Sequence, residues 1–251
     1  MKKRGLVEEA AFEETALIDG KVRLFQPRSG YRAAIDPVLL AAAVPAKDGE
    51  LLAELGMGSG AASLCLASRI AGCRIFGLEL QPELAEAARL GISANGLEGR
   101  VFVHLGDVKS PPAEFSAKNF DHVFFNPPYG QPSRGTLPPN ASKRVAHAEK
   151  EDDLGDWIKT AHALLRDKGR LAIIHRADRL DDIIALLKGR FGGVEIFPLW
   201  PKEGEAAKRV IVRARKGARS PLILHAGLVL HGQDGKFTPA TEEILRQFGG
   251  L

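Results

Sequence analysis

The sequence predicts an α/β fold in which helices cover both faces of a mostly parallel sheet. From about residue 50 onwards, short apolar runs alternate with longer stretches of helical periodicity, which is typical of strand-helix-strand units. Strands are expected at residues 51–55, 74–80, 101–105, 122–125 and 170–175. Helices are expected between and after them, at residues 61–71, 82–95, 154–166 and 179–188.

The last part of the sheet is expected to be antiparallel. Two further apolar runs, at residues 194–199 and 209–213, lie too close together for a helix to connect them, so they should pair as a hairpin and complete seven strands. Crossover-linked strands followed by such a hairpin are the pattern of the class I, Rossmann-like methyltransferase fold, whereas a dinucleotide-binding dehydrogenase would add another strand and helix. Residues 1–45 are expected to form an N-terminal element, with a helix near 37–44, that packs on a catalytic domain of residues 46–251.

The composition is that of a globular protein, with 45% hydrophobic and 26% charged residues. Cys65 and Cys73 lack the paired spacing of a zinc site or a disulfide framework, so we expect buried thiols, a reducing cytoplasm and no metal. We find neither a signal sequence nor a run long enough to span a membrane, and we expect a cytoplasmic monomer without a membrane partner. The net charge of +4 does not by itself indicate a nucleic-acid partner.

A glycine-rich segment follows the first of these strands and precedes a helix. Gly56, Gly58 and Gly60 would let the backbone pass close to a ligand, because a Cβ atom at these positions would block the approach. Glu54, just before the glycines, would repel a pyrophosphate and suits a ligand that carries an ammonium group. The segment therefore favours S-adenosylmethionine as the cofactor.

Acidic residues also follow the next two strands. Glu79, at the end of the second strand, could accept hydrogen bonds from the ribose hydroxyls, and Asp107, just past the third, could accept one from the cofactor's adenine amino group. Each residue alone could be an exposed loop carboxylate. Together with Glu54 they occupy successive strand ends, and ligands of open parallel sheets bind there.

The run Asn126, Pro127, Pro128 and Tyr129 comes directly after the fourth strand and is the candidate catalytic motif. Prolines fix φ and remove backbone donors, so the asparagine side-chain oxygen and a proline carbonyl could both accept hydrogen bonds from one amino group. Such a planar amino nitrogen is a poor nucleophile, and the two acceptors would stabilise the positive charge that forms on it during attack. Tyr129 offers a flat surface for stacking, and positioning supplies much of the remaining catalysis.

With these motifs the chain resembles the bacterial tRNA (adenine-N6)-methyltransferases that act on a valine tRNA. The resemblance is carried by the runs ELGMGSG at 54–60, NPPYG at 126–130 and AIDPVLL at 34–40, with weaker support from RVAHAE at 144–149 and from residues 222–245. The run at 34–40 departs from the family pattern, which has Thr and Gly where this chain has Ile35 and Pro37.

The resemblance implies S-adenosylmethionine as the cofactor and tRNA as the partner. It implies that Asp36 helps to close the cofactor pocket and that Arg144, His147 and Glu149 order the substrate loop.

Basic residues are concentrated in the predicted hairpin. Between Trp200 and Arg219 there are seven basic and two acidic residues, a local charge of +5. We expect Lys208, Arg209 and Arg213 to contact RNA, and Trp200 to stack on a base or to cover the sheet. The alternative for the charged residues is an ordinary solvated hairpin.

Other functions remain open from the sequence. The same motif could methylate a glutamine amide of a release factor, although the forty-odd residues before the sheet are few for the helical domain of those enzymes. Guanine N2 methylation of ribosomal RNA is a close alternative. DNA adenine methylation fits less well, because we see no room for a separate target-recognition domain and because duplex substrates require base flipping. A non-enzymatic RNA-binding module with the same fold is a further possibility.

Overall fold

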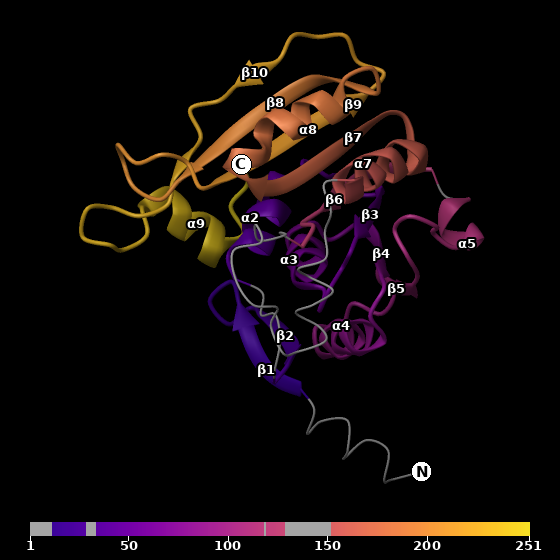
Figure 1. The fold of residues 1–251 in the computed structure, drawn as a ribbon. Coiled ribbons are helices and arrows are strands. Elements are labelled where there is room, and N and C mark those ends of the chain that lie inside the picture. Colours follow the sequence, from indigo (N-terminus) through magenta and orange to yellow (C-terminus); the bar gives the residue numbers. More distant parts are fainter. Residues whose placement is uncertain (1–11, 29–33, 118, 129–151) are drawn as a thin grey trace, which may run out of the picture.

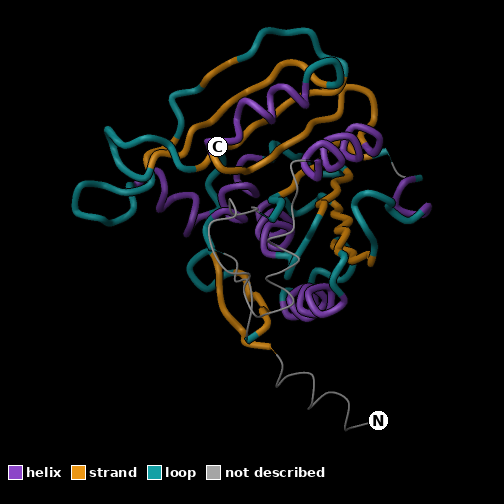
Figure 2. The backbone as a smooth tube through the Cα atoms, viewed as in Figure 1, coloured by secondary structure: helices purple, strands orange, loops and turns teal. Residues whose placement is uncertain are grey.

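The computed structural model describes residues 12–28, 34–117, 119–128 and 152–251. In the last of these ranges, side chains are described from residue 154 onwards. The main feature is a nine-stranded sheet in the order β10-β8-β9-β7-β6-β3-β4-β5, with β11 also pairing with β8 (Figure 1). Its strands are β3 (Leu51–Leu55), β4 (Arg74–Glu79), β5 (Val101–Leu105), β6 (Phe120–Phe125), β7 (Leu165–Arg176), β8 (Phe191–Trp200), β9 (Arg209–Lys216), β10 (Ile223–Leu224) and β11 (Leu228–Val229). The strands are orange in Figure 2.

Helices cover both faces of the sheet, as the sequence predicts. They are α2 (Asp36–Ala43), α3 (Ala61–Arg69), α4 (Pro82–Ala94), α5 (Ala113–Ser116), α7 (Asp152–Leu164), α8 (Leu180–Leu187) and α9 (Pro239–Gln247), with a short 3₁₀ turn, η1, at Ala177–Arg179. One hydrophobic core lies under α2, α3, α4 and α9, and a second lies under α5, α7 and α8. The central strands are apolar along nearly their whole length because both of their faces are buried.

The predicted antiparallel hairpin is confirmed, and its second strand lies inside the sheet. β9 pairs antiparallel with β8 on one side and with β7 on the other. The expected total of seven strands holds for the longer strands, and β10 and β11 extend the edge by pairing parallel with β8. Each of these added strands has two residues, too few to give a periodic pattern in the sequence.

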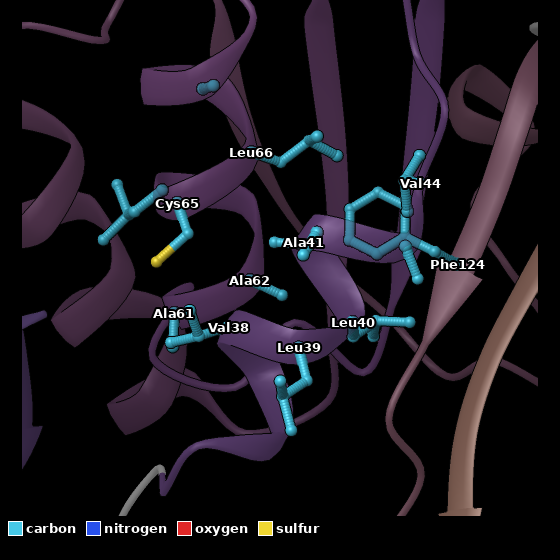
Figure 3. Packing of buried hydrophobic residues seen from close by; sticks show 14 of the residues in the cluster. Val38, Leu39, Leu40, Ala41, Val44, Ala61, Ala62, Cys65, Leu66 and Phe124 are labelled. Atoms are coloured by element: carbon cyan, nitrogen blue, oxygen red, sulfur yellow. The ribbon is translucent and has the colours of Figure 1, made fainter. Parts of the chain in front are cut away.

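The helices α2 and α3 pack closely on one face of the sheet (Figure 3). Small side chains at Ala41, Ala61 and Ala62 allow the two backbones to approach each other. Arg69, at the end of α3, donates hydrogen bonds to two carbonyl groups at the end of α2. Cys65 is buried in the same core, and burial raises the pKa of its thiol.

A hairpin of β1 (Phe12–Leu17) and β2 (Val22–Pro27) precedes α2 and is not foreseen by the sequence analysis. Val22 and Leu24 are fully buried in the core that also contains α3 and α4. Asn95, at the end of α4, exchanges two hydrogen bonds with the backbone of Arg23. The hairpin thus shares its core with the sheet, while the domain boundary at residue 45 stays a prediction.

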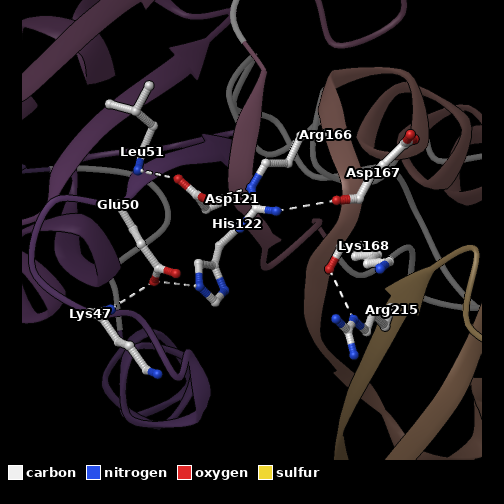
Figure 4. A network of polar contacts seen from close by, with 9 residues as sticks. All are labelled: Lys47, Glu50, Leu51, Asp121, His122, Arg166, Asp167, Lys168 and Arg215. Atoms are coloured by element: carbon white, nitrogen blue, oxygen red, sulfur yellow. Dashed lines mark hydrogen bonds and ion pairs between the residues drawn. The ribbon is translucent and has the colours of Figure 1, made fainter.

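A polar network holds together the edge of the sheet where the parallel strands begin (Figure 4). The Asp121 carboxylate accepts hydrogen bonds from the backbone N–H of Leu51, at 2.8 Å, and from Arg166 Nε, at 2.5 Å. Glu50 Oε2 lies 2.9 Å from Nε2 of the buried His122. These contacts fix the starts of β3 and β6, whose opposite ends carry the predicted motifs. Within the described ranges, no helix combines the length and the apolar character needed to cross a membrane.

Candidate active site

The predicted motifs meet at one edge of the sheet because the strands that carry them are parallel neighbours in register. Leu55 of β3 is paired with Leu78 of β4 on one side and with Phe125 of β6 on the other. The glycine-rich loop, Glu79 and Asn126 therefore follow adjacent strand ends. This edge is where ligands bind in open parallel sheets.

The glycine-rich loop has backbone angles that favour glycine. Gly56, Gly58 and Gly60 have φ values of 61°, 58° and 84°, in the left-handed region where other residues are strained. A Cβ atom at Gly58 would meet no atom within 4 Å, so the loop turns an open backbone surface outwards at this point. A ligand can approach the backbone there, and α3 begins immediately afterwards.

The helix α7 supports both the cofactor loop and the catalytic motif. A Cβ atom at Gly56 would lie 2.4 Å from the ring of Trp157, so the indole packs directly on the loop. The same indole makes an edge-on contact with Phe125, with ring centroids 5.4 Å apart. Trp157 thus contacts both the loop after β3 and the last residue of β6, a role that the sequence does not reveal.

Gly77 is a second site residue that the sequence analysis missed. It lies in the middle of β4, and a Cβ atom there would be 2.0 Å from the sulfur of Met57. Met57 is buried beneath the loop, and its backbone N–H donates a 3.0 Å hydrogen bond to the carbonyl of Leu78. A glycine inside a strand is the signal that could have identified this close approach.

Gly77→Ala is therefore expected to displace Met57, to destabilise the protein by about 1–3 kcal/mol and to weaken cofactor binding. Gly99→Ala is the matched control, because a Cβ atom at Gly99 meets nothing within 4 Å. Urea denaturation and S-adenosylmethionine titration of both variants give the comparison. Equal behaviour of the two would show that Met57 can move without disturbing the loop.

Glu54 is buried beneath the start of α3. Its Oε2 accepts a 3.1 Å hydrogen bond from the backbone N–H of Ser63 and another from the Ser63 hydroxyl. Burial raises the pKa of Glu54 to about 8, although both hydrogen bonds from Ser63 oppose the shift. The carboxyl group thus binds the first turn of α3, and its contact with the cofactor's ammonium group stays a prediction.

Glu79 is buried and bonded to the loop that follows β3. Its Oε2 accepts a 2.7 Å hydrogen bond from the backbone N–H of Gly58, and its Oε1 accepts a 2.8 Å bond from Gln81. Burial raises the pKa of Glu79, and the backbone hydrogen bonds oppose this shift. The carboxylate oxygens have further lone pairs, so they can still accept from ribose hydroxyls.

Asp107 lies in an exposed turn after β5. Its Oδ1 accepts a 2.9 Å hydrogen bond from the backbone N–H of Lys109, and its carbonyl accepts one from Ser110. The side chain therefore stabilises its own turn, and its predicted contact with the cofactor's adenine stays a prediction.

The catalytic motif is described as far as Pro128. Asn126 is partly exposed and Pro127 is buried, directly after the last residue of β6. Tyr129, Arg144, His147 and Glu149 lie outside the described residues, so their predicted roles in stacking and loop ordering remain predictions.

Comparison with known proteins identifies the family. Residues 37–181 match the model of the family described as N-6 DNA Methylase. The chain is 33% identical over 207 residues, covering 78% of each chain, to a tRNA1(Val) (adenine(37)-N6)-methyltransferase from Porphyromonas gingivalis. The chain belongs to this tRNA methyltransferase family. It is a class I methyltransferase that depends on S-adenosylmethionine, as the sequence predicts.

Solved structures agree with this fold. A predicted O-methyltransferase from Agrobacterium tumefaciens has a TM-score of 0.72 and 31% identity, over 86% of this chain and 98% of that one. A 16S rRNA guanine-N2 methyltransferase from T. thermophilus, in complex with AdoMet and guanosine, has a TM-score of 0.58 and 19% identity, over 82% of this chain and 50% of that one. The second likeness concerns the fold alone.

Two of the predicted substrate and cofactor residues in this methyltransferase are bonded to each other. Arg209 Nε donates a 2.9 Å hydrogen bond to Asp36 Oδ2, which joins the start of β9 to the start of α2. Arg209 pairs across the sheet with Arg176, the last residue of β7, so the ion pair lies at the same edge as the cofactor loop. Lys208, immediately before β9, is exposed at this edge.

Arg213 lies further along β9, away from Lys208 and Arg209. Its guanidinium group stacks over the Phe197 ring at 4.3 Å and donates a 2.5 Å hydrogen bond to Glu195. These contacts give Arg213 a structural role, and its contact with RNA stays a prediction. Trp200, at the end of β8, donates a 3.0 Å hydrogen bond to the carbonyl of Ala226.

Proposed function

We propose that the protein transfers the methyl group of S-adenosylmethionine to the N6 amino group of an adenine in tRNA. The observation that carries the proposal is the register of β3 and β6, in which Leu55 and Phe125 are paired. The segment that would bind the cofactor and the segment that would bind the acceptor nitrogen therefore begin side by side. The relatives named as tRNA adenine-N6 methyltransferases support tRNA as the substrate.

The cofactor would lie against the open backbone at Gly58, with its ribose at Glu79. The fit rests on the left-handed φ and unobstructed surface of Gly58 and on the unused lone pairs of the Glu79 carboxylate. When bound, S-adenosylmethionine supplies an electrophilic methyl group on a sulfonium.

Asn126 would orient the acceptor nitrogen. Its side-chain oxygen and the Pro127 carbonyl would accept hydrogen bonds from the two N–H groups of the adenine. These bonds favour a pyramidal nitrogen and stabilise the positive charge that develops on it. The methylated nitrogen then releases one proton to solvent, so no strong base is needed in the site.

The proposal also includes three expectations from the sequence: stacking of the adenine on Tyr129, a monomeric state and a cytoplasmic location.

The proposal is tested by offering labelled S-adenosylmethionine with purified bulk tRNA, ribosomal RNA and release factor in parallel reactions. Label is expected in tRNA, and nucleoside mass spectrometry should identify N6-methyladenosine. Label in protein alone would support the glutamine alternative, and N2-methylguanosine in ribosomal RNA would support the guanine alternative. Either of these results would overturn the proposal.

Lys208→Gln is expected to weaken tRNA binding and to lower the slope of log K against log salt by about 1, as for the loss of one phosphate contact. Lys208 is chosen because it is exposed at the edge that carries the catalytic motif. Lys188→Gln is the matched control, since Lys188 is exposed at the end of α8, near the opposite edge. Filter binding at several salt concentrations gives the slopes, and a slope for Lys208→Gln equal to that of wild type would show that Lys208 contacts no phosphate.

A further inference from the structure

A cavity lies at the edge of the sheet opposite the candidate active site. Its volume is about 270 Å³, and we call it the basal pocket. Its charged and polar lining comes from β6, β7, β8, β9 and the segment after β9: His122, Arg170, Glu195, Arg213, Arg215 and Ser220. The polar network in Figure 4, which includes His122 and Arg215, borders this region.

Two arginines face each other across adjacent strands in this pocket. Arg170 of β7 and Arg215 of β9 are direct antiparallel partners, so their side chains extend from the same face of the sheet. Like charges placed directly opposite each other destabilise a strand pair. An anion bound between Arg170 and Arg215 would therefore stabilise this part of the sheet.

At the other end of the same two strands, carboxylates of the protein balance a second pair of facing arginines. Arg176 and Arg209 are also direct partners, but Arg176 is paired with Asp178 and Arg209 with Asp36. At the basal pocket, the side chain of Arg170 has no hydrogen-bond or ion-pair partner among the residues the structure describes. The guanidinium group of Arg215 makes, within the same residues, one hydrogen bond, from Nε to the carbonyl of Lys168 at 3.1 Å.

The remaining charges of the pocket leave it positive. Three arginines line it, and its single lining carboxylate, Glu195, is bonded to Arg213. With His122 neutral, the formal charge of the lining is therefore +2. The Nε atom of Arg213 is buried and has no hydrogen-bond partner in the described part of the chain.

We propose that the basal pocket binds a phosphate group between Arg170 and Arg215. A dianionic phosphate balances the charge of the lining, and its oxygens match the donors of paired guanidinium groups. The cavity of about 270 Å³ has room for a phosphate group. The phosphate comes either from an RNA backbone or from a free phosphorylated molecule.

Thermal unfolding and calorimetric titration with inorganic phosphate test the site without cofactor or tRNA. Wild-type protein is expected to be stabilised by phosphate relative to chloride at equal ionic strength. Arg170→Gln and Arg215→Gln each remove one charged donor, so each should weaken phosphate binding by about tenfold or more. Arg89→Gln, on α4, removes the same charge at an exposed position outside the pocket and should bind phosphate as wild type does.

Both pocket variants are expected to fold, because neither arginine is buried and each substitution relieves the repulsion between them. Melting temperatures in chloride that are equal to or above that of wild type would confirm this. If all four proteins respond equally to phosphate, or if wild type does not respond, the proposal is wrong.

A tRNA-binding assay distinguishes the two sources of phosphate. Weaker tRNA binding by the pocket variants, with a lower salt slope, would assign the site to the RNA backbone. Unchanged tRNA binding together with lost phosphate binding would assign it to a free phosphorylated molecule. Because phosphate binding is measured without methyl transfer, the outcome does not depend on the proposed function.

Discussion

Asn126→Ala is expected to lower kcat at least about a hundredfold while changing the Kd for S-adenosylmethionine little. The side-chain oxygen would act on the acceptor nitrogen, and removing one preorganised hydrogen-bond partner of a developing charge costs about 10²–10³ in rate. Asn126 follows β6, whereas the cofactor loop follows β3, so the substitution leaves Gly56, Gly58 and Glu79 in place. Single-turnover methylation of tRNA and calorimetric titration of the cofactor measure the two effects separately.

Asn126→Asp is the informative companion variant because it keeps an acceptor oxygen at nearly the same position. It should retain more activity than Asn126→Ala. If Asn126→Ala instead loses cofactor affinity in proportion to its loss of rate, Asn126 belongs to the cofactor pocket. Its assignment to the acceptor nitrogen would then be wrong.

Glu54→Gln is expected to stabilise the protein at pH 8 and to leave its stability nearly unchanged near pH 4.5. Burial raises the pKa of Glu54 from an ordinary value of 4.5 to about 8. Between these values the unfolded chain releases a proton that the folded protein retains, so the wild-type free energy of unfolding falls as pH rises. Glutamine removes this dependence and can still accept a hydrogen bond from Ser63.

The shift of Glu54 sets an upper limit of about 4–5 kcal/mol on the gain at pH 8, because each pKa unit corresponds to about 1.4 kcal/mol. Urea denaturation at pH 5 and pH 8 measures it. Glu203→Gln, at an exposed position in the β8–β9 turn, is the control and should show no such gain. A loss of stability at pH 8 for Glu54→Gln would mean that the folded protein stabilises the ionised carboxylate.

The sheet and the glycine-rich loop could be predicted because their signals are local. Short, mostly apolar runs such as β3 and β6 can be recognised in the sequence, and glycines with left-handed φ directly follow β3. The hairpin of β1 and β2 was missed because each strand has only six residues, and its alternation of buried and exposed side chains is too short to stand out in the sequence. Trp157 acts through a contact with a distant loop, which no local pattern encodes. Gly77 does carry a local signal, a glycine inside a strand, but the Met57 side chain that requires it lies in another segment.

The basic hairpin shows why charge in a sequence window does not define a surface. Arg209, Arg213 and Arg215 alternate with apolar residues, so they share one face of β9. At about 3.3 Å per residue, however, Arg209 and Arg215 are roughly 20 Å apart. One end of the strand lies beside the catalytic edge and the other lines the basal pocket.

The position of β9 also matters for synthesis on the ribosome. This strand is made after β7 and β8 but lies between them, so β7 has no partner on that side until Arg209–Lys216 has emerged. The nascent chain then carries an unpaired apolar strand edge, which is a template for aggregation. A chain that ends before β9 should therefore depend on chaperones to remain in solution, even though every segment predicted to bind the cofactor has already been made.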